Sequence, residues 1–217
     1  MSELQLTIGN KNYSSWSLRP WILMKHLGLP FEERLIPLDT PEFARDIAAI
    51  SPTRRVPVLK HGDLLVWDSL AICEYVCDLT GRGLPADRAA RAVARAACAE
   101  MHAGFSIVRS QWPFNARAHG RRTPSSPERS AELARIEALW ADCRRRFGAN
   151  GPWLFGDYSI ADAMYAPIVL RMHTYGAALG PASESYSATV LADAHLRDWI
   201  SAATSESWSI EPSEVGR

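Results

Sequence analysis

The sequence predicts a two-part fold, in which an α/β domain is followed by an all-α domain. Up to about residue 80, short apolar segments with strand periodicity alternate with helical patterns. A stretch rich in glycine, Thr80–Pro85, comes next, and no strand pattern follows it. We therefore expect domains at residues 1–80 and 87–217, joined by a linker at 81–86. The 217 residues, 47% of them hydrophobic, are enough to give each domain a core.

Seven elements are expected in the first domain. Its first helix carries Pro20 in the first turn, where a missing amide is harmless, and stops at Gly28. The β-α-β-α-β-β-α order is that of a thioredoxin-like domain, which starts with a right-handed parallel crossover and ends with an antiparallel pair. The expected strands are Leu4–Ile8, Arg34–Leu38, Val56–Leu59 and Leu64–Trp67, and the expected helices are Ser17–Leu27, Pro41–Ile50 and Leu70–Leu79.

Only helices are expected in the second domain. Apolar or small residues recur every three or four positions from Val93 to Val108, which is the spacing of one helical face. Pro113 is expected to end this helix. The four expected helices cover Asp87–Ser110, the segment after Pro127 up to Phe147, a segment beginning near Ser159, and Val190–Ile200.

The charge balance argues against two classes of partner. The 24 basic side chains equal the 24 acidic ones, so no net field draws the chain to nucleic acid or to an anionic membrane surface. No stretch approaches the ~20 apolar residues of a membrane span. The N-terminus lacks the basic-then-apolar pattern of a secretory signal. Neither nucleic acid nor membrane is therefore an expected partner.

The four cysteines are expected to be buried structural thiols. Cys73 and Cys77 have the i, i+4 spacing that can meet a metal, but no second pair or nearby histidine completes a site. Cys98 and Cys143 also fall in apolar helical patterns. We expect no metal, and a reducing cytoplasmic location fits these thiols.

The most informative motif is a proline-containing strand followed by an acid–serine pair. Pro57 cannot donate to a strand ladder, so it predicts a strand entrance or a cis turn. Eleven residues later, Asp68 and Ser69 stand where a short strand gives way to an apolar helix. Such a helix N-terminus attracts a carboxylate, and Asp-Ser is also an ordinary N-cap. The residues by themselves leave both roles open.

Together these motifs resemble the glutathione site of the glutathione S-transferase family. The resemblance implies that Val56, which precedes a cis Pro57, pairs with the cysteinyl backbone of glutathione. It also implies that Asp68 and Ser69 hold the γ-glutamyl carboxylate, although the family more often has Glu before the Ser. Glutathione is then the expected co-substrate.

A second local match lies about 90 residues further on. Ser159 and Asp162 have the spacing of a capping box, with Asp in place of the usual Glu. This resembles the capping motif of the family's helical domain, whose role is in folding. The two matches together extend the resemblance over nearly the whole chain.

The chemistry of this family needs a hydrogen-bond donor aimed at the glutathione sulfur, because a free thiol titrates near ~8.5. Three hydroxyls, on Tyr13, Ser14 and Ser15, precede the first helix, whose field would add to their effect. The run from Ser14 to Arg19 resembles the Ser-type site of zeta-like and related bacterial classes, which implies Ser15 as the first catalytic choice and Ser14 as the second. Zeta-like enzymes have Cys where Trp16 stands. The loop has no cysteine, which argues against thiol-transferase chemistry.

The second substrate is expected between the domains, beside the helix over Asp87–Ser110. Residues 82–122 contain eight arginines and only two acidic residues. For any single arginine, a solvated helix face is the alternative explanation. We expect Arg109 or Arg117 to pair with an anionic co-substrate. The expected electrophile site consists of Met101, Phe105, Arg109, Trp112 and Arg117.

The resemblance implies a glutathione transferase that conjugates the glutathione thiolate to a small electrophile, and it implies a homodimer. One alternative is a zeta-like, glutathione-dependent cis–trans isomerase of a maleyl-type diacid. Another is a noncatalytic glutathione-binding module of a stress response. The tail after Ser205 remains open between a lid and a frayed end.

Overall fold

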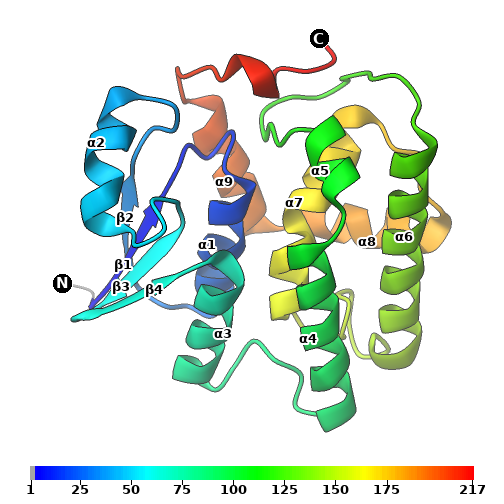
Figure 1. Ribbon diagram of the computed structural model, residues 1–217. Helices are drawn as coiled ribbons and strands as arrows, with labels where there is room; N and C mark the ends of the chain where they lie inside the picture. Colours follow the sequence, from blue (N-terminus) through cyan, green and yellow to red (C-terminus); the bar gives the residue numbers. More distant parts are fainter. Residues whose placement is uncertain (1–2) are drawn as a thin grey trace.

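The computed structural model describes residues 3–217, and its first part is built on a four-stranded sheet (Figure 1). The strands lie in the order β2-β1-β3-β4, with β1 parallel to β2 and antiparallel to β3. Figure 1 shows α2 on one side of the sheet and α1 and α3 on the other. The strands are β1 (Leu4–Ile8), β2 (Glu32–Leu35), β3 (Val58–His61) and β4 (Leu64–Trp67), and the helices are α1 (Ser15–His26), α2 (Pro41–Ile50) and α3 (Ser69–Thr80).

The second part contains helices throughout, so the expected combination of a thioredoxin-like α/β part and an all-α part is confirmed. Residues 1 and 2, which belong to the expected first domain, lie outside the described residues. The helices are α4 (Arg88–Ala103), α5 (Ser106–Gln111), α6 (Pro127–Phe147), α7 (Ile160–Tyr175), α8 (Pro181–Ala192), α9 (Ala194–Thr204) and a 3-10 turn at Glu211–Ser213.

Two expected strands lie in shifted positions. β2 ends at Leu35, whereas the prediction continued through Pro37, which has no amide for a ladder bond. β3 begins at Val58, two residues after the expected start, because Pro57 has no amide to donate to the ladder. The hairpin partner β4 has the expected bounds, with Val58 opposite Trp67.

The single helix expected over Asp87–Ser110 is wrong, because the chain breaks between α4 and α5. Phe105 has a φ of 56°, and a Cβ at Gly104 would lie 2.7 Å from the carbonyl oxygen of Glu100. The side chain of Glu132, on α6, accepts hydrogen bonds from the amides of Ile107 and Val108 and so starts α5 anew.

The helix expected over Val190–Ile200 is also two helices. α8 ends at Ala192, and Asp193 then caps α9 by accepting a hydrogen bond of 2.9 Å from the amide of Leu196. Because apolar residues recur with helical spacing across this break, the sequence predicted one helix, and Asp193 was not recognised as an N-cap.

Helix α7 forms the centre of the second part and is buried along almost its entire length. It packs against α1 and α3 of the first part and against α4 and α8 of the second. The Asp162 carboxylate in its first turn accepts hydrogen bonds from the Ser159 amide and hydroxyl at 2.9 Å, which is the expected capping arrangement. It also accepts from the Leu154 amide at 3.0 Å and the Tyr186 hydroxyl at 3.1 Å.

The C-terminal tail is attached to the first part of the chain. Glu206 accepts hydrogen bonds from the amides of Lys11 and Asn12 at 2.7 and 3.1 Å. Glu214 accepts from the Tyr13 hydroxyl at 2.6 Å and pairs with Arg121 at 2.5 Å. Figure 1 shows this segment crossing the molecule at one end. The tail is therefore not a frayed end.

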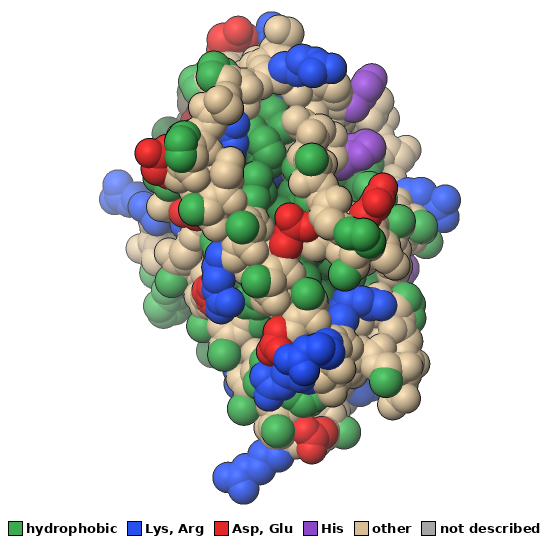
Figure 2. Space-filling view, turned by 90° about the vertical axis from the view of Figure 1, so that its right-hand side faces the viewer, with side chains coloured by type: hydrophobic (Ala, Val, Ile, Leu, Met, Phe, Trp, Pro, Cys, Tyr) green, Lys and Arg blue, Asp and Glu red, His purple; other side chains and the backbone are tan. Residues whose placement is uncertain are grey.

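Charged side chains of both signs are interspersed over the outer face of the helical part (Figure 2). Arg135 pairs with Glu100 at 2.7 Å, and Arg146 pairs with Asp142 at 3.0 Å. Such exposed pairs add little stability but leave no continuous basic band on this face. Within residues 3–217, no helix is long and apolar enough to cross a bilayer.

All four cysteines are buried and free, as expected for structural thiols. Burial raises the pKa of the Cys73 and Cys98 thiols well above the ordinary value, which keeps them protonated and unreactive. No group of three metal-ligating side chains lies together in the described part of the chain.

The Asp162 cap is expected to be a main determinant of stability. Asp162→Ala leaves the Leu154 amide and the Tyr186 hydroxyl buried without their acceptor, so the free energy of unfolding should fall by about 3 kcal/mol. Chemical denaturation measures this loss. The matched control is Asp157→Ala, an exposed residue of the same loop, which should change stability by less than ~0.5 kcal/mol. Equal losses in the two variants would contradict the role of Asp162.

Glu214 should make the stability depend on pH in the acid range. Burial acts to raise its pKa, but hydrogen bonds from Tyr13, Arg121, Arg217 and Asn115 lower it to about 2, from an ordinary 4.5. The unfolded chain then binds more protons, so the stabilisation is complete above pH 4.5 and is lost as the pH falls toward 2.

Glu214→Gln should therefore lower the free energy of unfolding by about 2 kcal/mol at neutral pH, and the difference from the unchanged protein should shrink below pH 4.5. Denaturation at a series of pH values measures it. Glu211→Gln, at an exposed position of the same tail, serves as the control. A difference that does not vary with pH would show that the ion pairs of Glu214 are not its cause.

Candidate active site

A cavity of about 390 Å³ lies where the first and second parts of the chain meet. Val56, Pro57, Asp68 and Ser69 all line it, so the structure brings together the four residues that were expected to bind glutathione. Its wall is completed by residues that include Trp16 from α1 and His102 from α4. Two motifs separated by ten residues in the sequence thus form one concave surface.

The prolyl turn places a main-chain segment along this cavity. The peptide bond between Val56 and Pro57 is cis, which is the form that the family resemblance implied. Pro57 is buried but Val56 is half-buried, and both precede the first paired residue of β3. The Val56 main chain is therefore left outside the sheet ladder, where an extended peptide has polar groups to pair with.

Asp68 adopts a backbone conformation that is costly for a residue with a side chain. Its φ is 73° and its ψ is 133°, outside the common regions. Its Oδ1 atom caps α3 by accepting hydrogen bonds from the amides of Leu70 and Ala71 at 2.9 and 3.3 Å. Its Oδ2 atom lies 3.1 Å from Nε2 of His102. Of the two roles left open by the sequence, the structure shows the cap, and the second oxygen of the same carboxylate is paired with His102.

Ser69 presents its hydroxyl at the start of α3. The side chain is buried, and its Oγ atom lies 3.5 Å from Nη1 of Arg19, at the outer limit of a hydrogen bond. Because the arginine can only donate, the Ser69 proton is left free for another acceptor. The amides of Leu70 and Ala71 are already bound by Asp68, so Ser69 supplies the hydroxyl and amide that can meet a carboxylate at this terminus.

The three hydroxyls before α1 have different partners. The Tyr13 hydroxyl donates to Glu214 at 2.6 Å. The Ser14 hydroxyl is the N-cap of α1 and donates to Oγ of Ser17 at 2.7 Å. Ser15 accepts from Nη2 of Arg171 at 3.3 Å, and its own proton has no recorded acceptor in the described part of the chain.

The Trp16 ring lies among three side chains at the cavity wall. The guanidinium of Arg19 lies over it at 4.1 Å from the ring centroid, and that of Arg109 lies at 5.2 Å. The His102 ring meets its edge at 5.3 Å. Trp16 therefore lies next to Ser15, and its ring attracts the guanidinium groups of Arg19 and Arg109 through cation–π interactions.

The expected electrophile residues lie in different surroundings. Met101 is fully buried, and Phe105 is buried at the break between α4 and α5. Trp112 is buried and stacks on Tyr175 at 5.3 Å. Arg117 donates to the carbonyl oxygens of Glu206 and Trp208 at 2.6 and 3.1 Å and so holds the tail. Arg109 is half-buried, and its guanidinium lies beside Trp16, which lines the cavity, although none of the five expected electrophile residues lines it directly.

Four residues of this site were not singled out as site residues from the sequence: Trp16, Arg19, His102 and Arg171. Trp16 and Arg19 belong to the serine motif, so the motif itself was a signal for them. His102 has one weak signal, a titratable residue one position after the apolar Met101. Arg171 has none, because it sits in a long apolar helix 156 residues from Ser15.

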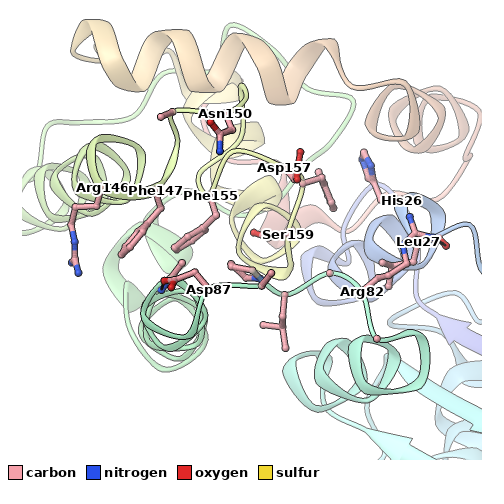
Figure 3. A pocket seen from close by; sticks show the side chains of 18 residues that line it. His26, Leu27, Arg82, Asp87, Arg146, Phe147, Asn150, Phe155, Asp157 and Ser159 are labelled. Atoms are coloured by element: carbon pink, nitrogen blue, oxygen red, sulfur yellow. Dashed lines mark hydrogen bonds between the residues drawn. The ribbon is translucent and has the colours of Figure 1, made fainter.

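A larger cavity, of about 750 Å³, lies beside the connection from α3 to α4 (Figure 3). In Figure 3 the Phe147 and Phe155 rings lie side by side, and the rings stack at 5.6 Å. His26 stacks on Tyr158 at 3.4 Å and pairs with Asp193 at 2.9 Å. None of the expected catalytic or binding residues lines this cavity.

Comparisons with known proteins agree with the arrangement of the two parts. Residues 13–79 match the family described as glutathione S-transferase, N-terminal domain, and residues 126–202 match the glutathione S-transferase C-terminal domain. A probable glutathione S-transferase from Oryza sativa subsp. japonica is 37% identical over 67 residues. That alignment covers 29% of this chain and 30% of the relative, so less than a third of the relative's length is spanned.

Solved structures match over much more of the chain. A glutathione transferase homolog from Burkholderia GL BGR1, with bound glutathione, is 25% identical, with a TM-score of 0.68 over 95% of this chain and 100% of that one. The theta class glutathione S-transferase from Xanthomonas axonopodis pv. citri, also with glutathione bound, is 20% identical, with a TM-score of 0.65 over 92% of this chain and 98% of that one. The chain therefore belongs to the glutathione S-transferase family.

Proposed function

We propose that the protein conjugates the thiolate of glutathione to a small electrophile. The observation that carries the proposal is the single cavity in which the cis Val56–Pro57 turn faces the Asp68–Ser69 terminus of α3. The Val56 main chain would pair with the cysteinyl backbone, and Ser69 would bind the γ-glutamyl carboxylate. The proposal is supported by bound glutathione in the related Burkholderia and Xanthomonas structures.

In the reaction, the thiol of bound glutathione loses its proton to solvent, and the thiolate forms a C–S bond to an electrophilic carbon. The electron pair of the bond broken at that carbon departs with the leaving group or, where a double bond opens, takes up a proton from solvent. Ser15 is the hydroxyl that we propose to face the sulfur. This choice over Tyr13 and Ser14 is supported by their hydrogen bonds, because those two already donate to Glu214 and Ser17. Ser15 accepts from Arg171 and keeps its own proton available.

The second substrate would lie on the Arg109 side of Trp16. Among residues 3–217, no carboxylate is in ion-pair contact with Arg109, whereas Arg117 is occupied by the tail. Arg109 is therefore the arginine that we propose to meet an anionic electrophile, with Trp112, Phe105 and Met101 giving the apolar packing behind it. An anionic diacid is also the substrate class that the isomerase alternative requires.

We propose a homodimer and a cytoplasmic location as well. The dimer is supported by large apolar side chains left exposed on β4, where Leu64, Leu65 and Trp67 have 48%, 36% and 44% exposure. An exposed apolar strand of this kind is usually covered by a partner. The location is supported by the four free cysteines.

The experiment that tests the function combines calorimetric binding of glutathione with conjugation assays on a panel of small electrophiles. Binding with turnover is the expected result. Binding without turnover on any electrophile favours the noncatalytic module. No measurable binding would refute both functions.

Ser69→Ala should weaken the binding of glutathione about tenfold or more, because it removes a hydrogen bond to a carboxylate, worth about 1.5–3 kcal/mol. Isothermal calorimetry measures the loss. The control is Ser110→Ala, an exposed position near the end of α5, which should bind glutathione unchanged. Unaltered affinity in Ser69→Ala would place the carboxylate elsewhere.

Arg109→Ala should slow the turnover of acidic electrophiles more than that of neutral ones of similar size, since a lost charge-assisted bond is worth about 1.5–3 kcal/mol, or roughly tenfold or more in kcat/KM. Paired assays on an acid and its amide measure the ratio. An equal loss on both substrates would refute the role of Arg109 in recognising an anion.

A further inference from the structure

Arg171 is held so that one edge of its guanidinium faces Ser15. It lies in α7 and is only 5% exposed. Its Nε atom donates to the carbonyl oxygen of Trp112 at 2.8 Å, and Nη1 lies 3.4 Å from that of Pro167. Nη2 donates to Oγ of Ser15 at 3.3 Å. Main-chain acceptors and the Phe114 ring, centred 5.3 Å from the guanidinium, thus orient the group, and Ser15 is the side chain to which it donates in the described part of the chain.

The arginines around Ser15 have no carboxylate in direct contact in the described part of the chain. Within residues 3–217, none of Arg19, Arg109 and Arg171 forms an ion pair with a carboxylate. Arg19 is fully buried, and its Nε and Nη2 atoms have no hydrogen-bond partner there. Burying a cation without a counter-ion is expensive, so an anion formed beside this group would relieve the cost.

The pKa values of the arginines agree with a cluster of buried positive charges that repel one another. Burial, and then repulsion from Arg19 and Arg109, lowers the pKa of Arg171 to about 9. Burial also lowers the pKa of Arg19 to about 10. Both guanidinium groups still carry their charge at neutral pH, so the field that they create is permanent under working conditions.

The other titratable groups near Ser15 do not neutralise the positive charge of the three arginines. Asp68 on α3 and His102 on α4 pair with each other at 3.1 Å. Tyr175 on α7 donates to the carbonyl oxygen of Pro113 at 3.1 Å, and burial raises its pKa, so it is neutral at neutral pH. Asp68 attracts Arg19 and Glu132 attracts Arg109, so each carboxylate acts to raise the pKa of its arginine. Among the described residues, no carboxylate offsets the lowered pKa of Arg171.

We infer that Arg171 is a positioning residue for thiol activation, which donates to the Ser15 hydroxyl so that the Ser15 proton is directed to the sulfur of glutathione. The inference rests on the proposed function, because it takes Ser15 as the hydroxyl that faces the sulfur. A hydroxyl that accepts from a charged donor becomes a stronger donor itself. The thiol proton passes to solvent, and the thiolate is stabilised by the hydroxyl and by the cations behind it.

The pKa of the glutathione thiol in the complex tests this role, measured by the ultraviolet absorbance of the thiolate. Arg171→Gln should raise that pKa by about one unit, which leaves about tenfold less thiolate at neutral pH. Arg171→Lys should give a smaller rise in the thiol pKa, because it keeps the positive charge but replaces the several fixed N–H donors of the guanidinium with a single Nζ. Arg135→Gln, at an exposed arginine of α6, is the matched control and should leave the pKa unchanged.

A double variant separates action through Ser15 from a general effect of charge. If Arg171 acts through the Ser15 hydroxyl, then adding Arg171→Gln to the Ser15→Ala variant should change the fraction of thiolate by less than about twofold. A full tenfold change in the Ser15→Ala background would overturn the inference. So would an unchanged thiol pKa in Arg171→Gln alone.

The outcomes also separate this inference from the proposed function. If Ser15→Ala leaves the thiol pKa unchanged, the assignment of Ser15 is wrong and the inference falls with it, whereas conjugation itself is judged by the binding and turnover assays. If Ser15→Ala raises the pKa and Arg171→Gln does not, only the role of Arg171 is wrong. Should Arg171→Gln fail to fold, NMR of the unchanged protein remains decisive. The guanidinium resonance of Arg171 should shift with the same pKa as the bound thiol, and a resonance that does not titrate refutes the inference.

Discussion

The burial of α1 between the sheet and α7 is the constraint on which the site depends. Nine of its twelve residues are buried, and it packs against both α3 and α7. Its N-terminus therefore lies at the contact between the two parts of the chain. Ser15 meets Arg171 of the second part there, and Asp68 at the start of α3 meets His102 of α4. Neither part by itself contains the whole arrangement.

The features that were predictable from the sequence are those determined by neighbouring residues. A proline that cannot donate to a ladder predicted a strand entrance or a cis turn at Pro57, and the family resemblance favoured the cis turn that is found. An acid before an apolar helix predicted the cap at Asp68. The Ser159–Asp162 pair was visible for the same reason, since its hydrogen bonds join positions three residues apart. The order of strands and helices followed from periodicity, and family resemblance gave these local signals a common meaning.

The features that were not predictable depend on residues brought together by packing. The break between α4 and α5 is stabilised by Glu132, which is 25 positions away from Ile107, and no local pattern indicates it. Arg171 lies in a helix that is buried on all sides, so its sequence context predicts only a core. Which of the three hydroxyls keeps a free proton also depends on distant partners, because Glu214 engages Tyr13 from 201 positions away.

The attachment of the tail affects the order in which parts of the chain can fold during synthesis. The amides of Lys11 and Asn12, just before the serines, are bound by Glu206, and Tyr13 is bound by Glu214. A ribosome makes the N-terminal residues first, and domains generally begin to fold as they emerge. The sheet can assemble early, but the loop that carries the hydroxyls acquires these partners only after Glu206 and Glu214 have been made. A nascent chain halted before Glu206 would thus hold this loop in an unfinished state.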